Sequence, residues 1–435
     1  MIKKIREFVT AEGRAKLIKD VSTVFLGSTL SRLLNFISFL LIAKGLSVPD
    51  YGILSVLLSL IATLGDLVNS GLTASTMRYT AIFNEQNERE KIGKLLSTSI
   101  LNTLILTIVV VLVTALSSSF LSDLLFKQDL RLLLVVSAIG ILSTFLYSNL
   151  NSILQGLQDF KGMFILSMAF GIERLIPITI LFFGQQMAIP TMVFLFAFTP
   201  FTPILIGIWM IISRHKIPFS LFKYDFGIVK EMFNFGKWMS LWSVVAIIQS
   251  RMDVYLLSIL TTTTQVALYD VSGKFVSVVG MGLGAYANVI NPKIASYTDK
   301  EKIKIEIKKI VKVTTLLTAG LAVGFIVLPF VIQIIFGSKY DGSLLPLRIM
   351  LFGLVFYLWT FPFNSALYAI GKSNSFFFTA LFQLVANTIA SFLLLSTLGA
   401  VGASISYVIV NIVALAGSYF FYRKFFISEQ KNEKA

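Results

Sequence analysis

Long apolar runs separated by short polar stretches dominate this chain of 435 residues. Most runs contain about 20 residues or more, which is the length that an α-helix needs to cross a lipid bilayer. The pattern therefore predicts twelve transmembrane helices, with ends placed to within a few residues. They cover approximately residues 19–43, 52–74, 95–118, 131–155, 161–183, 187–213, 236–260, 264–290, 311–336, 346–370, 375–396 and 399–422.

The composition agrees with a membrane protein. Hydrophobic residues make up 56% of the chain and charged residues only 14%, against roughly 25% charged residues in soluble domains. This excludes a soluble enzyme, a disordered chain and a fibrous protein. The mean hydropathy of +0.83 also excludes an outer-membrane barrel, whose strands alternate polar and apolar residues. The absence of Cys and the single histidine, His215, predict no metal site, and we expect no cofactor.

The basic residues orient the predicted helices. Of 37 Lys and Arg residues, 28 fall in segments on one side of the membrane, five on the other side and four inside predicted helices. Cytoplasmic segments carry the excess of Lys and Arg, so we expect a multi-pass protein of the cytoplasmic membrane with both termini in the cytoplasm. The net charge of +15 therefore does not indicate nucleic acid. Basic residues interleave with Ile in the segments 1–18 and 300–312, which favours interfacial amphipathic helices.

The two halves of the chain resemble each other. The segment Asn151–Lys161 matches the segment Asn364–Asn374, and a weaker match at nearly the same spacing aligns 52–56 with 267–271. Six helices form each half, so both halves begin on the same side and the repeat is parallel. This predicts an all-α protein with two six-helix lobes around a cavity, as in transporters. The predicted parts are an N-terminal lobe (1–213, including an amphipathic segment 1–18), a cytoplasmic linker (214–235), a C-terminal lobe (236–422) and a cytoplasmic tail (423–435).

Several charged residues lie inside the predicted helices, where each costs about 2.5–3.5 kcal/mol on insertion scales. Asp270 and Lys274 are four residues apart on one helix, which predicts a local ion pair. Arg32 and Arg251 have no acid at helical spacing, so they are the first candidates for a cationic cavity. The alternative is that each arginine pairs with a carboxylate on another helix. The full set is Arg32, Asp66, Glu173, Arg174, Arg251, Asp253, Asp270 and Lys274.

Two stretches near the N-terminus, Gly45–Gly52 and Asp66–Tyr79, resemble the opening of polysaccharide-biosynthesis flippases of the Wzx type. These belong to the multidrug/oligosaccharidyl-lipid/polysaccharide (MOP) exporter superfamily, together with multidrug and toxin extrusion (MATE) transporters and lipid II flippases. Further matches follow in the same order as in the family. They are Arg251–Ser258, Val266–Asp270, Phe336–Tyr340, Leu347–Met350, Gly371–Lys372, Asn387 and Leu398–Ala403.

The resemblance implies a polyprenyl-diphosphate-linked oligosaccharide as cargo, moved from the inner to the outer leaflet by alternating access. It also implies a cationic cavity that binds the headgroup, at Arg32 and Arg251 and then at Arg174 and Lys274. The carboxylates of Asp66, Glu173 and Asp253 are candidates for H⁺ or Na⁺ coupling. Membrane lipids, a polysaccharide polymerase and glycosyltransferases are the expected partners.

Other functions fit the same residues less well. A MATE-like, cation-coupled multidrug exporter is the alternative, although cationic drugs favour an acidic cavity. A membrane glycosyltransferase or polymerase is disfavoured because the longest outer loop, about 119–130, is too short to hold a catalytic site. The sequence Gly371-Lys372-Ser373 lacks the upstream glycine of a phosphate-binding loop, so no ATPase site is predicted. Neither the sugar nor the polymer follows from the sequence.

Overall fold

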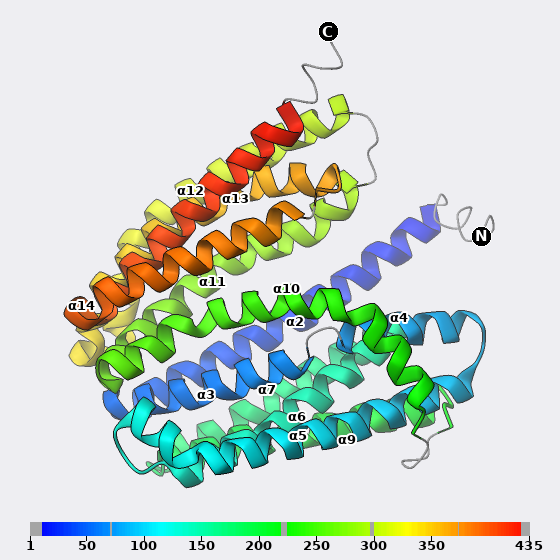
Figure 1. Ribbon diagram of the computed structural model, residues 1–435, viewed down its shortest axis with the longest axis horizontal. Coiled ribbons are helices and arrows are strands. Elements are labelled where there is room, and N and C mark those ends of the chain that lie inside the picture. The colour runs from blue at the N-terminus through cyan, green and yellow to red at the C-terminus, as the bar shows by residue number, and fades with distance from the viewer. Residues whose placement is uncertain (1–10, 70–71, 219–223, 296–299, 373, 428–435) are drawn as a thin grey trace. The chain divides into compact units, whose positions relative to one another are not determined.

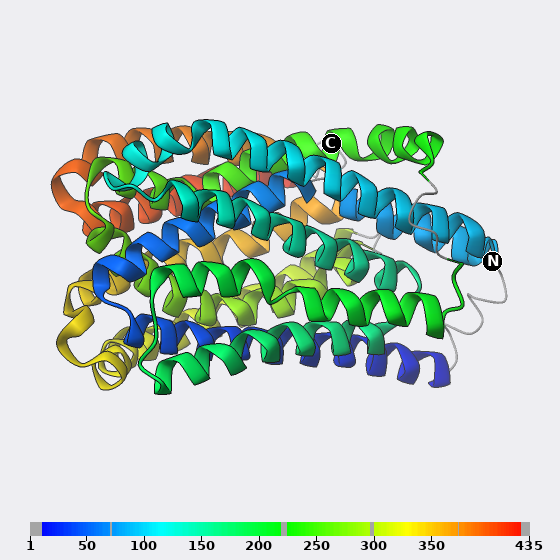
Figure 2. The same ribbon diagram turned by 90° about the horizontal axis from the view of Figure 1, so that it is seen from below.

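The computed structural model describes residues 11–69, 72–218, 224–295, 300–372 and 374–427. Within these ranges the chain forms helices and turns, with no strand (Figures 1 and 2). The all-α fold is thus confirmed. Residues 1–10 of the predicted amphipathic segment and residues 428–435 of the predicted tail lie outside the described residues.

The first half of the chain contains helices at all six predicted ranges and one further helix, which lies mostly between the predicted helices 52–74 and 95–118. They are α2 (Ala11–Gly45), α3 (Val48–Asn69), α4 (Leu72–Glu85), α5 (Arg89–Phe126), α6 (Arg131–Gly156), α7 (Phe160–Phe183), α8 (Ile189–Phe198), α9 (Phe201–Trp209) and the π-turn η1 (Met210–Arg214). The predicted helix 187–213 is built from three pieces, α8, α9 and η1. Pro200 precedes α9 and supplies no backbone N–H to continue α8.

The second half contains fewer but longer helices. They are α10 (Phe226–Leu260), α11 (Thr263–Ala295), α12 (Lys300–Phe336), the 3₁₀ segment η2 (Gly337–Ser343), α13 (Leu344–Ala369), α14 (Asn374–Tyr422) and η3 (Arg423–Ile427). The last two predicted helices, 375–396 and 399–422, form the single element α14. Gly399 interrupts its helical backbone with φ 55° and ψ −128°.

Ten of the twelve predicted ranges each fall on a single helix, to within one residue. The range 52–74 runs from α3 into α4 across residues 70–71, which lie outside the described residues, and 187–213 is divided among α8, α9 and η1. Nine stretches of the described residues are long and apolar enough to cross a membrane. Two of them, Lys302–Ala369 and Asn374–Phe426, each contain two predicted spans, and the predicted span 264–290 lies in none of the nine. The protein is therefore a multi-pass membrane protein, and the count of twelve spans stays a prediction.

The internal contacts divide the chain into two compact units. Unit 1 comprises residues 1–46 and 57–247, and unit 2 comprises residues 47–56 and 248–435. In unit 1, α2 packs along α7 and α5 along α6, whereas in unit 2, α13 packs against α11, α12 and α14. Residues of both α3 and α10 contribute to each unit. The lobes 1–213 and 236–422, which the repeat defines, remain a prediction about which helices move together.

The core of unit 1 lies where α5, α6 and α7 meet. Leu95, Leu96 and Ile153 are completely buried there, together with Leu154 and Leu166. Between helices that cross a membrane, close van der Waals packing of such side chains holds the helices together. This core holds the turn between α6 and α7 in place. Beside this turn, the side chain of Asp159 contacts those of Arg214 and His215.

Left-handed backbone recurs at corresponding places in the two halves. The non-glycine residues with positive φ in the first half include one after α5, one between α6 and α7, and one after α7. Each has a glycine counterpart in the second half, at nearly the spacing that separates the repeated segments of the sequence. The pairs are Lys127 and Gly337, Gln158 and Gly371, and Gln185 and Gly399.

The turn between α6 and α7 matches the turn between α13 and α14 bond for bond. In each, three successive N–H groups donate to carbonyls four, three and five residues earlier, which is the Schellman motif. In the first turn, the N–H groups of residues 157, 158 and 159 donate to the carbonyls of residues 153, 155 and 154. In the second turn, the N–H groups of residues 370, 371 and 372 donate to the carbonyls of residues 366, 368 and 367. The N···O distances are 2.9–3.2 Å. The predicted repeat is therefore present in the backbone.

Candidate functional site

A polar network in unit 2 surrounds Asp253, one of the predicted coupling carboxylates. Its Oδ2 accepts a hydrogen bond from the Tyr269 hydroxyl at 2.8 Å, and its Oδ1 accepts one from the Ser391 hydroxyl at 3.4 Å. Ser406 donates to Oδ1 of Asn387 at 2.9 Å, and the Ser391 hydroxyl, 3.2 Å from the same oxygen, shares its single hydrogen between Asn387 and Asp253. Asp253 on α10 is thus held by neutral donors from α11 and α14.

Asp270 is the second carboxylate held inside unit 2, and its side chain is buried. The predicted pair with Lys274 is present, with 3.9 Å between Nζ and Oδ1. The other oxygen, Oδ2, accepts a hydrogen bond from the Tyr51 hydroxyl, and the Tyr51 ring lies edge-on to Tyr340. Tyr51 precedes Asp270 by 219 residues, so local spacing in the sequence does not predict this hydrogen bond. The sequence singles out Tyr51 only as part of the Gly45–Gly52 motif.

Arg32 and Arg251, the two leading cavity candidates, lie on α2 and α10. Arg32 is exposed and Arg251 is partly exposed. In the described part of the chain, neither guanidinium forms an ion pair or a hydrogen bond. The alternative of pairing with Asp253 is not realised, because Asp253 is held by Tyr269 and Ser391.

Arg174 on α7 is held by aromatic rings in unit 1. Its guanidinium carbon lies 4.2 Å from the centre of the Phe170 ring and 4.6 Å from that of Phe196. Its Nη1 donates to Oδ1 of Asn35 on α2 at 3.5 Å. Next to it, Oε2 of Glu173 is buried with no hydrogen-bond partner among the described residues. Arg174 therefore links α2, α7 and α8 and is less available to a ligand than Arg32 or Arg251.

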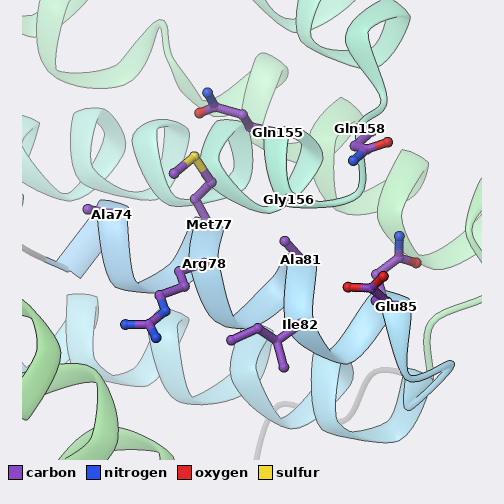
Figure 3. Close-up of a pocket in the computed structure, with 10 residues that line it drawn as sticks. Ala74, Met77, Arg78, Ala81, Ile82, Glu85, Gln155, Gly156 and Gln158 are labelled. Carbon is purple, nitrogen blue, oxygen red and sulfur yellow. The ribbon is translucent and has the colours of Figure 1, made fainter. Parts of the chain in front are cut away.

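A groove of about 750 Å³ runs along α4 in unit 1. Figure 3 shows Met77, Arg78 and Glu85 on α4, with Gln155 and Gln158 on the facing turn at the end of α6. Ligand sites commonly occupy about 300–1,000 Å³, so the groove has the size of a binding site. Its lining combines apolar atoms with amide groups, the guanidinium of Arg78 and the carboxylate of Glu85.

The sequence does not predict a binding site at the groove residues. Arg78 belongs to the Asp66–Tyr79 family motif, and Gln155 and Gln158 belong to the repeated segment Asn151–Lys161. Nothing in the local sequence shows that these two segments face each other. One signal points to the groove. The Asp66–Tyr79 motif and the Asn151–Lys161 segment both place polar residues at the same end of the predicted helices.

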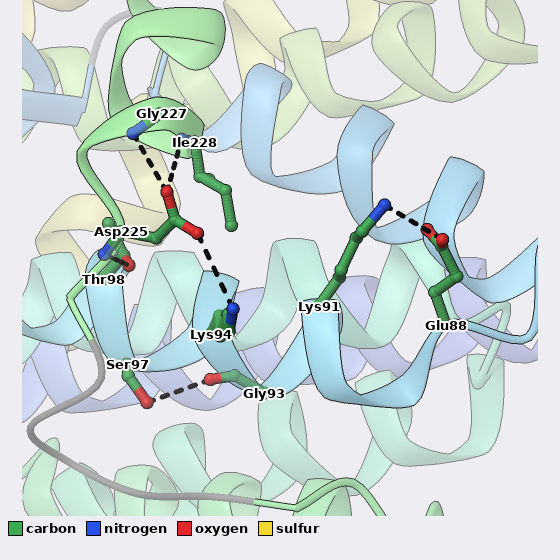
Figure 4. A network of polar contacts seen from close by, with 9 residues as sticks. All are labelled: Glu88, Lys91, Gly93, Lys94, Ser97, Thr98, Asp225, Gly227 and Ile228. Atoms are coloured by element: carbon green, nitrogen blue, oxygen red, sulfur yellow. Dashed lines mark hydrogen bonds and ion pairs between the residues drawn. The ribbon is translucent and has the colours of Figure 1, made fainter.

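The segment before α10 is fastened to α5 by Asp225 (Figure 4). Its Oδ1 accepts hydrogen bonds from the N–H groups of Gly227 and Ile228, at 2.9 and 3.2 Å, and so caps α10. Its Oδ2 lies 4.0 Å from Nζ of Lys94, and its N–H donates to the Thr98 hydroxyl at 3.1 Å. The middle of the predicted linker 214–235 therefore contacts α5, and the second half of that linker is already helical, because α10 begins at Phe226.

The family of the chain follows from its similarity to known proteins. The sequence profile described as "Polysaccharide biosynthesis protein" matches residues 17–298. The chain belongs to this family. A Shigella flexneri protein described as an O-antigen transporter is 24% identical over 399 residues, covering 90% of this chain and 94% of that protein. The Staphylococcus aureus capsular polysaccharide biosynthesis protein CapF is 22% identical over 421 residues, covering 94% of this chain and all of CapF.

Solved structures confirm the expected fold of this polysaccharide biosynthesis protein. An inward-facing MATE family transporter superposes with a TM-score of 0.75 at 17% identity, covering 93% of this chain and 96% of that chain. The lipid II flippase MurJ in an inward closed conformation gives 0.73 at 17% identity, covering 92% and 87%. The family and these relatives place the chain among membrane transporters rather than enzymes.

Proposed function

We propose that this polysaccharide biosynthesis protein is a flippase for a polyprenyl-diphosphate-linked oligosaccharide. It moves the headgroup from the inner to the outer leaflet of the cytoplasmic membrane by alternating access, with both termini in the cytoplasm. The observation that carries the proposal is a groove of about 750 Å³ lined by amide groups, one guanidinium, one carboxylate and apolar atoms, in a member of a polysaccharide biosynthesis family.

The groove lining suits a sugar headgroup. Sugars present hydroxyl groups that both donate and accept hydrogen bonds, and the amides of Gln155 and Gln158 can answer both. Arg78 adds the planar donor pair that binds phosphate oxygens in a bidentate manner. The apolar share of the lining, which includes Met77 and Ile82, offers contact to the C–H faces of sugar rings.

Arg32 and Arg251 supply the cations for the diphosphate in this proposal, followed by Arg174 and Lys274. A charged side chain in a membrane-spanning helix is stable only beside water or a partner. Because neither Arg32 nor Arg251 has an ionic partner among the described residues, a water-filled substrate path is the environment that fits them. Arg174 between two rings and Lys274 near Asp270 have partners already.

Asp253 is the carboxylate best placed to couple transport to H⁺ or Na⁺. Its three polar neighbours, Tyr269, Ser391 and Asn387, tie α10 to α11 and α14. A change in its charge would therefore act on the packing of three helices at once. Glu173, with its unbonded Oε2, and Asp66 are the other two candidates.

A MATE-like, cation-coupled drug exporter is the second candidate function. It is favoured by the carboxylates of Asp253 and Asp270 inside unit 2 and by the 0.75 TM-score to a MATE transporter. Cationic drugs would need carboxylates open to the cargo, whereas hydroxyl groups already hold both carboxylates.

Variants of the arginines test the proposal. Arg251→Ala should slow transport of the lipid-linked oligosaccharide at least tenfold, since a hydrogen bond to a charged group contributes about 1.5–3 kcal/mol and 1.4 kcal/mol is tenfold. Arg251→Lys should restore only part of the rate, because lysine lacks the planar donor pair. The control is Arg348→Ala, which removes an exposed arginine of equal charge on α13.

The melting temperature of each purified variant completes this test. An unchanged melting temperature with slow transport supports a binding role for Arg251. If Arg251→Ala transports at the wild-type rate, or if it fails only because the protein unfolds, the assignment of Arg251 is wrong. Faster export of a cationic dye than of the oligosaccharide lipid would favour the drug-exporter function.

A further inference from the structure

A second, smaller cavity of about 280 Å³ lies in unit 1 where four chain segments meet. These segments are the end of α4, the first turn of α5, the turn between α6 and α7, and residues 214–217, which begin at the last residue of η1. Asn84 lines both this cavity and the groove along α4. The cavity volume is far above the roughly 30 Å³ that a water molecule occupies in the liquid, so a small charged group fits inside it.

The cavity lining is strongly basic. Four of its eight lining residues are Arg89, Arg214, His215 and Lys216, and none of the eight is acidic. Arg214 and His215 both contact Oδ2 of Asp159, at 3.1 and 2.8 Å. Asp159 is buried, and its Oδ1 accepts a hydrogen bond from the N–H of Gly162 at the start of α7. One carboxylate behind the lining thus balances one of these cations.

Arg89 and Lys216 remain as excess positive charge. Neither forms an ion pair within the described residues. Glu88, the carboxylate adjacent to Arg89 in the sequence, is held by Lys91 at 2.9 Å. Lys216 directly follows the C-cap of η1 and has the left-handed backbone, with φ 53°, that is common just past a helix end.

We propose that this cavity binds a phosphate group, with Arg89 and Lys216 as the residues that contact it. Arginine matches phosphate oxygens through two parallel N–H donors, and lysine adds a compact point charge. Two sources carry this chemistry, namely the headgroup of an anionic phospholipid and a soluble phosphate compound. Trp209, five residues before Arg214, is 64% exposed, and exposed tryptophans mark the level of lipid headgroups.

Binding to the purified full-length protein in a neutral detergent tests this site without any transport step. One arm titrates phosphatidylglycerol against phosphatidylcholine of the same acyl chains and counts retained lipids by native mass spectrometry. The other arm titrates inorganic pyrophosphate against sodium chloride of equal ionic strength and follows the melting temperature. We expect saturable binding of phosphatidylglycerol, pyrophosphate or both. Binding of phosphatidylglycerol alone identifies the headgroup as the source, and binding of pyrophosphate alone identifies a soluble compound.

The double variant R89Q/K216Q should weaken that binding at least tenfold. Glutamine at position 216 has the same left-handed strain as lysine, and both side chains are exposed, so the fold should be retained. The matched control K161Q/K230Q removes two exposed lysines of unit 1 that do not line the cavity, and it should bind within twofold of wild type. The proposal is overturned if both double variants lose affinity equally, if neither loses it, or if wild type binds no probe. If the double variant fails to fold, the single variants R89Q and K216Q are measured instead, and their loss of binding is compared with that of the control in the same way.

Discussion

The turn between α6 and α7 and the turn between α13 and α14 have the same backbone but different side chains. Both close with three N–H donors at the same relative positions, and both have a left-handed residue, Gln158 in the first and Gly371 in the second. The residue after it is Asp159 in one turn and Lys372 in the other. Asp159 is buried and paired with two basic side chains, whereas Lys372 lies over the Phe425 ring at 5.1 Å.

This difference shows which features follow from the repeat and which were added to one half. The hydrogen-bonded turn is a backbone property that many residues can adopt, so it recurs with Gln or with Gly. The ion pairs of Asp159 need Arg214, the last residue of η1, and His215, which follows it. Lys372 has the opposite charge and cannot form these pairs, so substitutions at the paired positions should have unequal effects.

The largest difference is expected at the third pair of turns. Gly399→Ala should lower the free energy of unfolding by about 2–4 kcal/mol, because φ 55° with ψ −128° is nearly restricted to glycine. The new Cβ would also lie 2.4 Å from Oε1 of Gln265, which caps the N–H of Ala400 at 2.8 Å. The counterpart Gln185 already carries a side chain, so Gln185→Ala should change stability by less than about 1 kcal/mol. Unfolding of the two purified variants in detergent measures both changes. Equal losses of unfolding free energy would contradict the expected difference between positions 399 and 185.

A smaller difference is expected for the residues that follow the left-handed positions. Asp159→Ala should destabilise the protein by about 2–3 kcal/mol, since it removes a helix cap of about 1 kcal/mol and charge-assisted hydrogen bonds. Asp159→Asn should keep the cap and cost less. Lys372→Ala removes a cation–π contact with Phe425, which contributes about 0.5–1 kcal/mol. Melting of the three purified variants measures the order, which should run from Asp159→Ala through Asp159→Asn to Lys372→Ala.

The smallest difference concerns the left-handed residues themselves. Gln158→Gly should raise the free energy of unfolding by a few tenths to about 1 kcal/mol, because glycine avoids the Cβ strain of φ 58° at some cost in chain entropy. Gly371→Ala should lower it by about 1 kcal/mol through backbone strain alone, since no atom lies within 4 Å of the added Cβ. Thermal unfolding should show the two shifts with opposite signs, and shifts of the same sign would show that the turns differ in ways the backbone does not reveal.

The sequence predicted the features that depend on local pattern. The helices follow from runs of apolar residues, the repeat from the Asn151–Lys161 and Asn364–Asn374 segments, and the Asp270–Lys274 pair from its spacing of four residues. Each of these needs only neighbours in sequence or a second copy of the same pattern.

The partners that come from distant residues could not be predicted. Tyr51 meets Asp270 across 219 residues, Ser391 meets Asp253 across 138, and His215 meets Asp159 across 56. Each pair depends on which helix faces are turned toward each other, and apolar helices in a membrane have no polar face that would show this. The groove along α4 was missed for the same reason, because its two walls come from separate parts of the chain.

The proposed function requires the protein to carry a lipid-linked oligosaccharide across the bilayer. The most direct measurement reconstitutes the purified protein into vesicles that contain a polyprenyl-diphosphate oligosaccharide in both leaflets. A membrane-impermeant reagent that modifies the sugar then reports how much headgroup reaches the outside. We predict that wild-type protein makes nearly the whole pool accessible, and that Arg251→Ala vesicles react slowly beyond the outer-leaflet fraction. Accessibility limited to the outer leaflet with correctly folded wild-type protein, under an imposed H⁺ or Na⁺ gradient as well as without one, would contradict the account.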